Sequence, residues 1–99
     1  AATAHPLATR AAADVLQGGG RAADAAIAAN AVLAVVHPHA CGRGGDFSAL
    51  VLDAETVSCL EGMGRSGAGA SIERVRARGL SAMPPVGAMA VSVPGCADA

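Results

Sequence analysis

Residues 22–36 are the segment that most constrains how this chain can fold. At helical spacing the segment is apolar almost all round, and Asp24 lies near its N-terminal end, where the helix dipole favours a carboxylate. His37 and Pro38 end it, because the residue before a proline is disfavoured in the helical conformation. A helix that is apolar on all sides must be buried on most of them. The sequence therefore predicts a helix that lies inside something larger than 99 residues.

The composition predicts a thin hydrophobic core. Hydrophobic residues make up 53% of the chain, but half of that count, 26 residues, is alanine, and there is one Phe with no Tyr and no Trp. Buried apolar surface contributes roughly 25 cal/mol per Å², and alanine buries little of it. We expect the chain to need surface from further polypeptide in order to fold stably.

Charge and cysteine content bear on the class of protein and its location. The formal net charge is −1 and Phe47 is the one Phe, Tyr or Trp residue, so a nucleic-acid partner is not expected. No segment approaches the roughly 20 apolar residues of a membrane span. Three cysteines without metal or disulfide spacing favour a reducing compartment, and so the cytoplasm. The chain opens on Ala1, which indicates a trimmed start and leaves open a removed signal peptide with a periplasmic or secreted location.

A second helix and a hairpin flank the apolar segment. Residues 7–17 are predicted to form an amphipathic helix that follows Pro6 and ends at three glycines. Residues 47–52 are apolar on both faces, which favours a strand that is covered on both sides. Residues 57–61 return as a second strand after a turn, so the two form an antiparallel hairpin.

The last third of the chain is predicted to contain one short helix and one strand. Ser71 can cap a helix that runs to Arg78, and Gly79 ends it. Residues 88–93 are predicted to form a third strand, closed by Pro94. The expected fold class is α+β, in one domain, with two N-terminal helices, a β-hairpin, a short helix and a further strand.

Two motifs resemble ligand sites without predicting one. Residues 42–45 are as rich in glycine as a phosphate loop, but they follow a helix and precede a strand, which reverses the order of that motif. His37, His39 and Cys41 could bind zinc only with a fourth ligand from elsewhere. No metal and no cofactor are therefore expected.

The charged residues elsewhere also favour ordinary roles. Two carboxylate pairs, Asp46 with Asp53 and Glu55 with Glu61, have only strand ends and a turn around them, which gives no support for acid–base chemistry. Three arginines near the C-terminal end of the short helix are expected to form a solvated face that suits the helix dipole. They are Arg74, Arg76 and Arg78.

Five motifs, taken together and in order, resemble the start of the large subunit of γ-glutamyltransferase, also called γ-glutamyltranspeptidase. They are residues 4–9 (AHPLAT), 16–26 (LQGGGRAADAA), 35–46 (VVHPHACGRGGD), 62–65 (GMGR) and 90–95 (AVSVPG). The last two correspond to the family's substrate-arginine loop and its Val-Pro-Gly strand end. The resemblance covers essentially the whole chain, and the order of five matches makes it specific.

The chain departs from the family pattern at four positions. The family usually has Asn where Arg21 stands and Glu where His37 stands. It commonly has an aliphatic residue at the position of Arg43 and Glu at the position of Ser66. These differences concern substrate specificity and leave the expected fold unchanged.

The resemblance implies an N-terminal-nucleophile hydrolase with an αββα sandwich. In that family the precursor cuts itself, and the new N-terminal Thr serves as nucleophile and, through its amine, as base. This Thr and the glycine pair of the oxyanion hole lie downstream in the small subunit, so no catalytic residue is expected in this chain. Residues 1–99 would then be an incomplete N-terminal part of the large subunit, with the rest of that subunit and the small subunit as partners.

Arg65 is the one residue to which the resemblance assigns a function. A γ-glutamyl donor carries a free α-carboxylate beside an α-amine, and a guanidinium can bind that carboxylate through two parallel charge-assisted hydrogen bonds. Composition alone would favour a solvated loop arginine. With the resemblance, Arg65 is the expected substrate-binding residue.

The implied reaction is transfer or hydrolysis of the γ-glutamyl group of glutathione or a related amide, and the chain alone is expected to be inactive. A cephalosporin or glutaryl acylase on the same scaffold is one alternative, because a glutaryl group is a γ-glutamyl group without its amine. A non-catalytic module that only binds a partner is the other. The sequence after Ala99 distinguishes them, since a Thr cleavage site followed by a Gly-Gly pair would indicate the enzyme.

Overall fold

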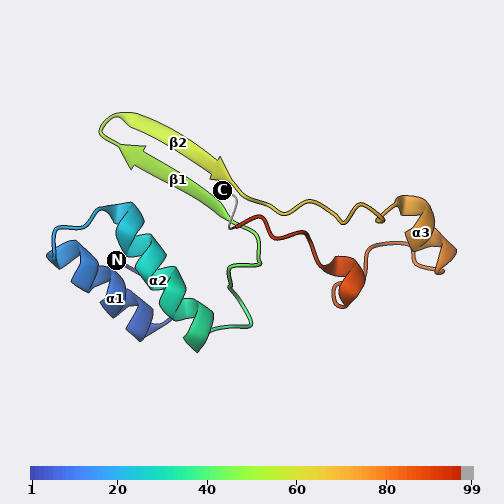
Figure 1. The fold of residues 1–99 in the computed structure, drawn as a ribbon, viewed down its shortest axis with the longest axis horizontal. Coiled ribbons are helices and arrows are strands. Elements are labelled where there is room, and N and C mark those ends of the chain that lie inside the picture. The colour runs from blue at the N-terminus through green and yellow to red at the C-terminus, as the bar shows by residue number, and fades with distance from the viewer. Residues whose placement is uncertain (97–99) are drawn as a thin grey trace. The chain divides into compact units, whose positions relative to one another are not determined.

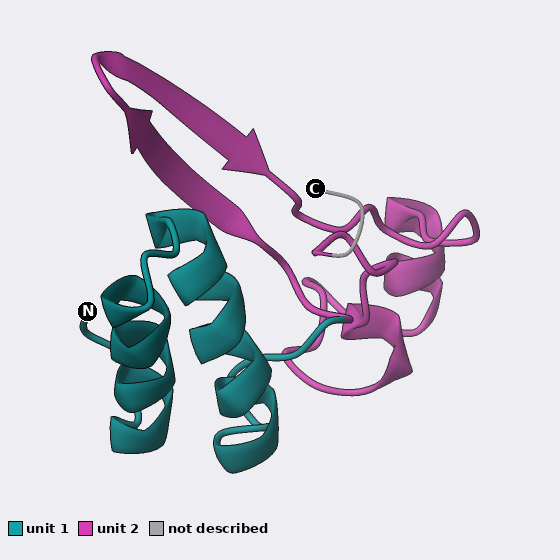
Figure 2. Ribbon diagram, turned by 60° about the vertical axis from the view of Figure 1, so that its left-hand side comes forward, with its two compact units in different colours: residues 1–43 teal, residues 44–99 magenta. Residues whose placement is uncertain are grey.

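The computed structural model describes residues 1–96. Its elements follow in the order helix, helix, strand, strand, helix and a short 3-10 helix (Figure 1). The chain divides into two compact units, residues 1–43 and the part that begins at Gly44 (Figure 2). The combination of helices with an antiparallel hairpin agrees with the predicted α+β class.

Helix α1 spans Pro6–Gln17 and begins one residue before the predicted start. The Nδ1 atom of His5 accepts a hydrogen bond from the Leu7 amide at 3.2 Å and caps the helix, while proline occupies its first position. The N–H of Gly18 donates to the carbonyl oxygen of Asp14 at 3.0 Å and closes the last turn. Pro6 and the three glycines therefore mark the two ends of the helix, as predicted, and the His5 cap is an addition that the structure shows.

Helix α2 spans Ala22–Val36, with the bounds that the sequence predicts. The Asp24 carboxylate accepts a hydrogen bond from the backbone N–H of Arg21 at 2.9 Å, at the positive end of the helix dipole. At the other end the His37 N–H donates to the Leu33 carbonyl oxygen at 2.7 Å.

Small side chains form the contact between α1 and α2. The buried residues are Ala8, Ala12, Ala25 and Ala29. An alanine contact lets two helices approach closely but buries little apolar area. Ile27 and Val35 of α2 are 70% and 79% exposed, so this unit leaves part of the apolar surface of α2 uncovered.

Strands β1 (Ser48–Asp53) and β2 (Thr56–Glu61) form the predicted antiparallel hairpin. β1 lies one residue later than predicted, and β2 begins one residue earlier. The register pairs the first residue of β1 with the last residue of β2. The turn places Ala54 at φ 52°, in the left-handed region that is uncommon for a non-glycine residue.

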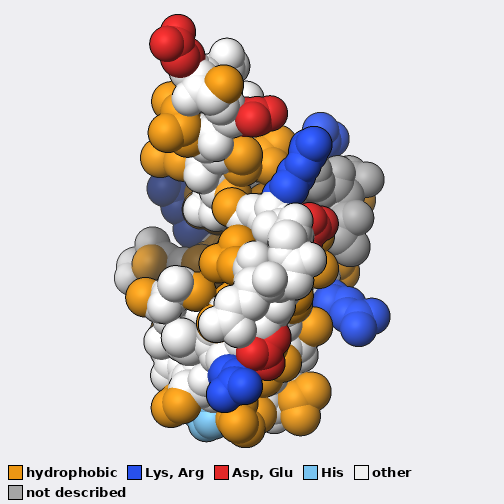
Figure 3. Space-filling model, turned by 90° about the vertical axis from the view of Figure 1, so that its left-hand side faces the viewer, with side chains coloured by type: hydrophobic (Ala, Val, Ile, Leu, Met, Phe, Trp, Pro, Cys, Tyr) orange, Lys and Arg blue, Asp and Glu red, His pale blue; other side chains and the backbone are white. Residues whose placement is uncertain are grey.

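Both faces of the hairpin carry exposed apolar side chains, some of which are visible in Figure 3. Leu50, Leu52 and Val57 share one face, and Leu50 is 77% exposed. Val51 and Leu60 lie on the opposite face and are also exposed. The described residues of this unit therefore do not supply the cover that the sequence predicts for both faces.

The prediction of a third strand over residues 88–93 is wrong. Ala88–Ala90 form a 3-10 helix, η1, which follows Gly87 at φ 100°. Beyond it, the Val93 N–H donates to the Arg65 carbonyl oxygen at 2.8 Å. A strand needs a partner backbone along its length, and this segment has one at a single point. Among the described residues, β1 and β2 are the only strands that form a sheet.

Helix α3 spans Ile72–Ala77 and ends one residue before the predicted end. The Ser71 hydroxyl accepts a hydrogen bond from the Arg74 amide at 3.3 Å, which is the predicted cap. Gly79, at φ 75°, follows the helix in the left-handed conformation that commonly ends one. A backbone hydrogen bond, and then one to the Ser71 side chain, lower the pKa of the exposed Glu73 carboxyl.

Candidate functional site

Arg65 lies in the loop that joins β2 to α3, within the second unit. Its side chain is exposed, and within residues 1–96 its guanidinium forms no ion pair and no hydrogen bond. Such a group retains all its N–H donors for a ligand. The chemistry available here is the recognition of an anion.

Backbone hydrogen bonds hold this loop on both sides of Arg65. Phe47 and Gly62 exchange two bonds, from the Phe47 N–H at 3.1 Å and from the Gly62 N–H at 2.7 Å, which extend the hairpin beyond its strands. The carbonyl oxygen of Arg65 accepts the bond from Val93. The loop is therefore anchored to one segment of the chain shortly before its arginine and to another at the arginine itself.

A carboxylate adds a side-chain link at the same place. Asp46 Oδ1 accepts a hydrogen bond from the Gly64 N–H at 3.1 Å and another from the Ser92 hydroxyl at 3.2 Å. Three of the five motifs that resemble the γ-glutamyltransferase family thus contribute residues to one place. The three motifs are separate segments of the sequence, and the structure brings them together.

Two glycines allow the arginine loop and the segment of residues 92–95 to approach each other closely. A Cβ atom on Gly64 would lie 2.8 Å from both Cβ and Oγ of Ser92. A Cβ atom on Gly95 would lie 2.7 Å from the Gly64 nitrogen and 2.9 Å from the Gly62 carbonyl carbon. Real Cβ atoms essentially never come closer than 3.0 Å to such atoms, so glycine is required at both positions for this packing.

In the sequence Asp46 is the last residue of a family-like motif and one half of a carboxylate pair, and the structure separates that pair. Asp46 precedes β1 and Asp53 ends it, while Glu55 in the turn precedes β2 and Glu61 ends that strand. At roughly 3.4 Å per residue, the first pair is about 24 Å apart and the second about 20 Å. In the sequence, the feature that could have indicated the position of Asp46 is that it directly follows Gly44 and Gly45 and shortly precedes a strand.

The histidine and cysteine motif lies in the other unit. The rings of His37 and His39 are 4.2 Å apart between centroids, and the Cys41 thiol donates to the His37 carbonyl oxygen at 3.5 Å. No group of three or more His, Cys, Asp or Glu side chains within the described residues is arranged to hold a metal ion. The cysteines of the described part are free thiols, and Arg43 is exposed.

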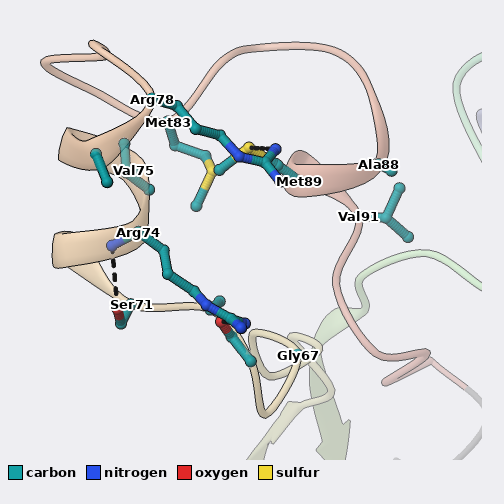
Figure 4. A pocket seen from close by; sticks show the side chains of 12 residues that line it. Gly67, Ser71, Arg74, Val75, Arg78, Met83, Ala88, Met89 and Val91 are labelled. Atoms are coloured by element: carbon teal, nitrogen blue, oxygen red, sulfur yellow. Dashed lines mark hydrogen bonds between the residues drawn. The ribbon is translucent and has the colours of Figure 1, made fainter.

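A cavity of about 550 Å³ lies between α3 and η1 (Figure 4). The Arg74 guanidinium donates to the Gly69 carbonyl oxygen at 2.6 Å, and that of Arg78 donates to the Met89 sulfur at 2.8 Å. The three arginines of this segment are exposed, as predicted, but two of them fold back on the chain. Arg65 does not line the cavity, so the cavity is separate from the candidate site.

No helix in the described part of the chain is long and apolar enough to cross a membrane.

Known proteins are similar to this chain in sequence and in fold. The crystal structure of Helicobacter pylori gamma-glutamyltranspeptidase matches with a TM-score of 0.86 and 33% identity, over 97% of this chain and 29% of that chain. The glutathione hydrolase-like YwrD proenzyme of Bacillus subtilis (strain 168) is 44% identical over 97 residues, which is 95% of this chain and 18% of that protein. The glutathione hydrolase proenzyme of the same strain is 43% identical over 72 residues, which is 71% of this chain and 12% of that protein.

The structural match therefore defines a chain with the fold of the corresponding part of a gamma-glutamyltranspeptidase. The family model of gamma-glutamyltranspeptidase matches residues 8–99. The chain belongs to the gamma-glutamyltranspeptidase family, as its motifs predict, and it spans less than a fifth of the length of these two curated relatives.

Proposed function

We propose that residues 1–99 are the N-terminal part of the large subunit of a γ-glutamyltransferase or glutathione hydrolase-like enzyme. The reaction is transfer or hydrolysis of the γ-glutamyl group of glutathione or a related amide. The family membership supports it, as do the names of the two curated relatives, both glutathione hydrolase or hydrolase-like proenzymes. The rest of the large subunit and the small subunit of the same precursor are the partners.

The exposed apolar surfaces support the sandwich that the family resemblance implies. In an αββα sandwich a strand is covered on both faces by further layers. The apolar side chains on both faces of the hairpin suit such cover, and so does the uncovered surface of α2. The partner segments would supply these layers.

The nucleophile is an N-terminal Thr outside this chain. Its hydroxyl attacks the γ-carbonyl carbon and its own amine accepts the hydroxyl proton; the amide C–N bond then breaks, and the leaving amine takes up that proton. Water or an acceptor amine then releases the γ-glutamyl group. Thr3 and Thr9 of this chain suit other roles, since their hydroxyls lie 2.8 Å apart and that of Thr3 also donates to the His5 carbonyl oxygen at 2.9 Å.

Arg65 binds the α-carboxylate of the γ-glutamyl donor. The observation that carries this assignment is an exposed guanidinium, without a partner in residues 1–96, on a loop that is anchored at Gly64 and at the Arg65 carbonyl group itself. An arginine on a fixed backbone loses less conformational freedom when it binds a carboxylate in the two-pronged geometry.

The glutaryl acylase and the non-catalytic module are less well supported, because one curated relative is named a glutathione hydrolase proenzyme and the other a glutathione hydrolase-like proenzyme. The test uses the complete precursor with a γ-glutamyl anilide and the matching glutaryl anilide, which lacks the α-amine. We expect mass spectrometry to show cleavage before a Thr, and the γ-glutamyl anilide to be the better substrate. An uncut, inactive precursor would indicate the binding module, and a clear preference for the glutaryl anilide would indicate the acylase.

A further inference from the structure

We infer that Asp46 is a positioning residue for Arg65: its carboxylate joins the Gly64 amide to the Ser92 hydroxyl and so fixes the backbone from which Arg65 meets the substrate. The inference rests on the proposed function, because it concerns the same substrate-binding loop. It assigns a role to a carboxylate that does not itself contact the substrate.

The geometry places one oxygen atom at the junction of three segments. Asp46 Oδ1 lies 3.1 Å from the Gly64 nitrogen and 3.2 Å from Ser92 Oγ, and these partners are 18 and 46 positions away along the chain. Gly64 directly precedes Arg65. The bond to its N–H therefore restrains the peptide that leads into the arginine.

The other restraints on this segment come from the backbone. They act at Gly62, through Phe47, and at the Arg65 carbonyl group, through Val93. Between these two points, within residues 1–96, Asp46 provides the only side-chain hydrogen bond to the loop. Without it the Gly64 amide has no partner in the described chain, and the loop can shift between its two remaining anchors.

Both hydrogen bonds use the same oxygen, which makes a sharp pair of variants available. Asp46→Asn keeps one carbonyl oxygen that can accept both bonds, whereas Asp46→Ala removes the acceptor. Asp53→Ala is the matched control, because Asp53 is also an exposed aspartate of this hairpin but lies at its turn. The role requires an acceptor oxygen at position 46 but does not require a negative charge there.

The experiment uses the complete, self-cleaved enzyme with a γ-glutamyl anilide and the 4-aminobutyryl anilide, which is the same amide without the α-carboxylate. Asp46→Ala should lower kcat/KM for the γ-glutamyl anilide by about 10-fold, mainly through KM: a displacement of about 1 Å can cost roughly 100-fold, and the two remaining backbone anchors limit the shift of the loop. It should leave the 4-aminobutyryl anilide nearly unaffected. Asp46→Asn should stay within about 3-fold of the wild type, and Asp53→Ala should match the wild type.

A double variant separates this inference from the proposed function. If Asp46 acts through Arg65, Asp46→Ala should cause no further loss in an Arg65→Ala background. Equal losses on both anilides after Arg65→Ala would contradict the proposed function itself. A selective loss after Arg65→Ala, together with an unselective or fully additive loss after Asp46→Ala, would overturn only the inference.

A variant that fails to mature does not prevent the test. If Asp46→Ala gives no cleaved enzyme, Ser92→Ala removes one of the two partners and leaves the carboxylate in place. It should lower kcat/KM selectively for the γ-glutamyl anilide, by less than the loss after Arg65→Ala. A Ser92→Ala enzyme with unchanged selectivity between the two anilides would overturn the inference.

Discussion

Gly95→Ala should displace the arginine loop without changing any residue in it. The new Cβ atom would lie 2.7 Å from the Gly64 nitrogen, and the Gly62 carbonyl oxygen would be nearer still. Ordinary contact begins at 3.4 Å, so one of the two backbones must move by about 0.7 Å or more. Both neighbours are backbone atoms, which cannot rotate away as a side chain does.

The expected cost follows from this displacement. Overpacking of this kind destabilises a protein by about 1–3 kcal/mol, and a misplacement of about 1 Å can lower activity by roughly 100-fold. In the complete enzyme we therefore expect a lower denaturation midpoint and a 10- to 100-fold lower kcat/KM for a γ-glutamyl anilide, by the same relation.

Gly67→Ala provides the matched control. A Cβ atom at Gly67 would meet nothing within 4 Å, and this glycine belongs to the same loop. The control should stay within about 0.5 kcal/mol of the wild type in stability, with unchanged kinetics. If Gly95→Ala behaves like Gly67→Ala in both measurements, the close packing of residues 62–64 against Gly95 does not position the loop, and the reasoning is refuted.

Two further predictions concern residues 1–99 as an isolated chain. The chain should be unstable or self-associated, because α2 and both faces of the hairpin expose apolar surface; a sharp, reversible thermal transition of a monodisperse monomer in calorimetry and light scattering would contradict this. It should also show no γ-glutamyl transfer, because the nucleophile lies elsewhere; turnover of a γ-glutamyl anilide that persists after contaminating enzymes are removed would contradict the placement of the nucleophile.

The local elements were predictable because their signals are local. Pro6 marks the start of α1, and Ser71 and Gly79 mark the two ends of α3, through backbone and capping preferences that act within one turn. The apolar pattern of residues 22–36 gives the bounds of α2. These signals need no knowledge of the rest of the chain.

The prediction of a third strand is wrong for a reason that depends on distant segments of the chain. Residues 88–93 have the composition of a strand, but strand formation requires a partner backbone, and no local pattern reports one. The structure offers that segment a single backbone bond, at Val93, and η1 forms before it. Propensity alone therefore overestimated the sheet.

The candidate site was predictable only in part for the same reason. Arg65 was found through the family resemblance, because a single exposed loop arginine carries no signal of its own. The role of Asp46 depends on contacts with Gly64 and Ser92, which are 18 and 46 residues away. A glycine such as Gly95 is visible in the sequence, but the backbone that it admits is visible only in the fold.

The most direct measurement compares Arg65→Ala and Arg65→Lys with the wild-type complete enzyme, by steady-state kinetics on the γ-glutamyl and 4-aminobutyryl anilides. Loss of a charged hydrogen-bonding pair costs about 1.5–3 kcal/mol, so Arg65→Ala should lower kcat/KM for the γ-glutamyl anilide about 10- to 150-fold and leave the other anilide nearly unchanged. Arg65→Lys should recover part of the loss, because an ammonium keeps the charge without the two-pronged geometry. Self-cleavage should survive both changes, since it needs no donor carboxylate. Equal losses on the two anilides, or kinetics close to the wild type, would contradict the assignment of Arg65 to the α-carboxylate.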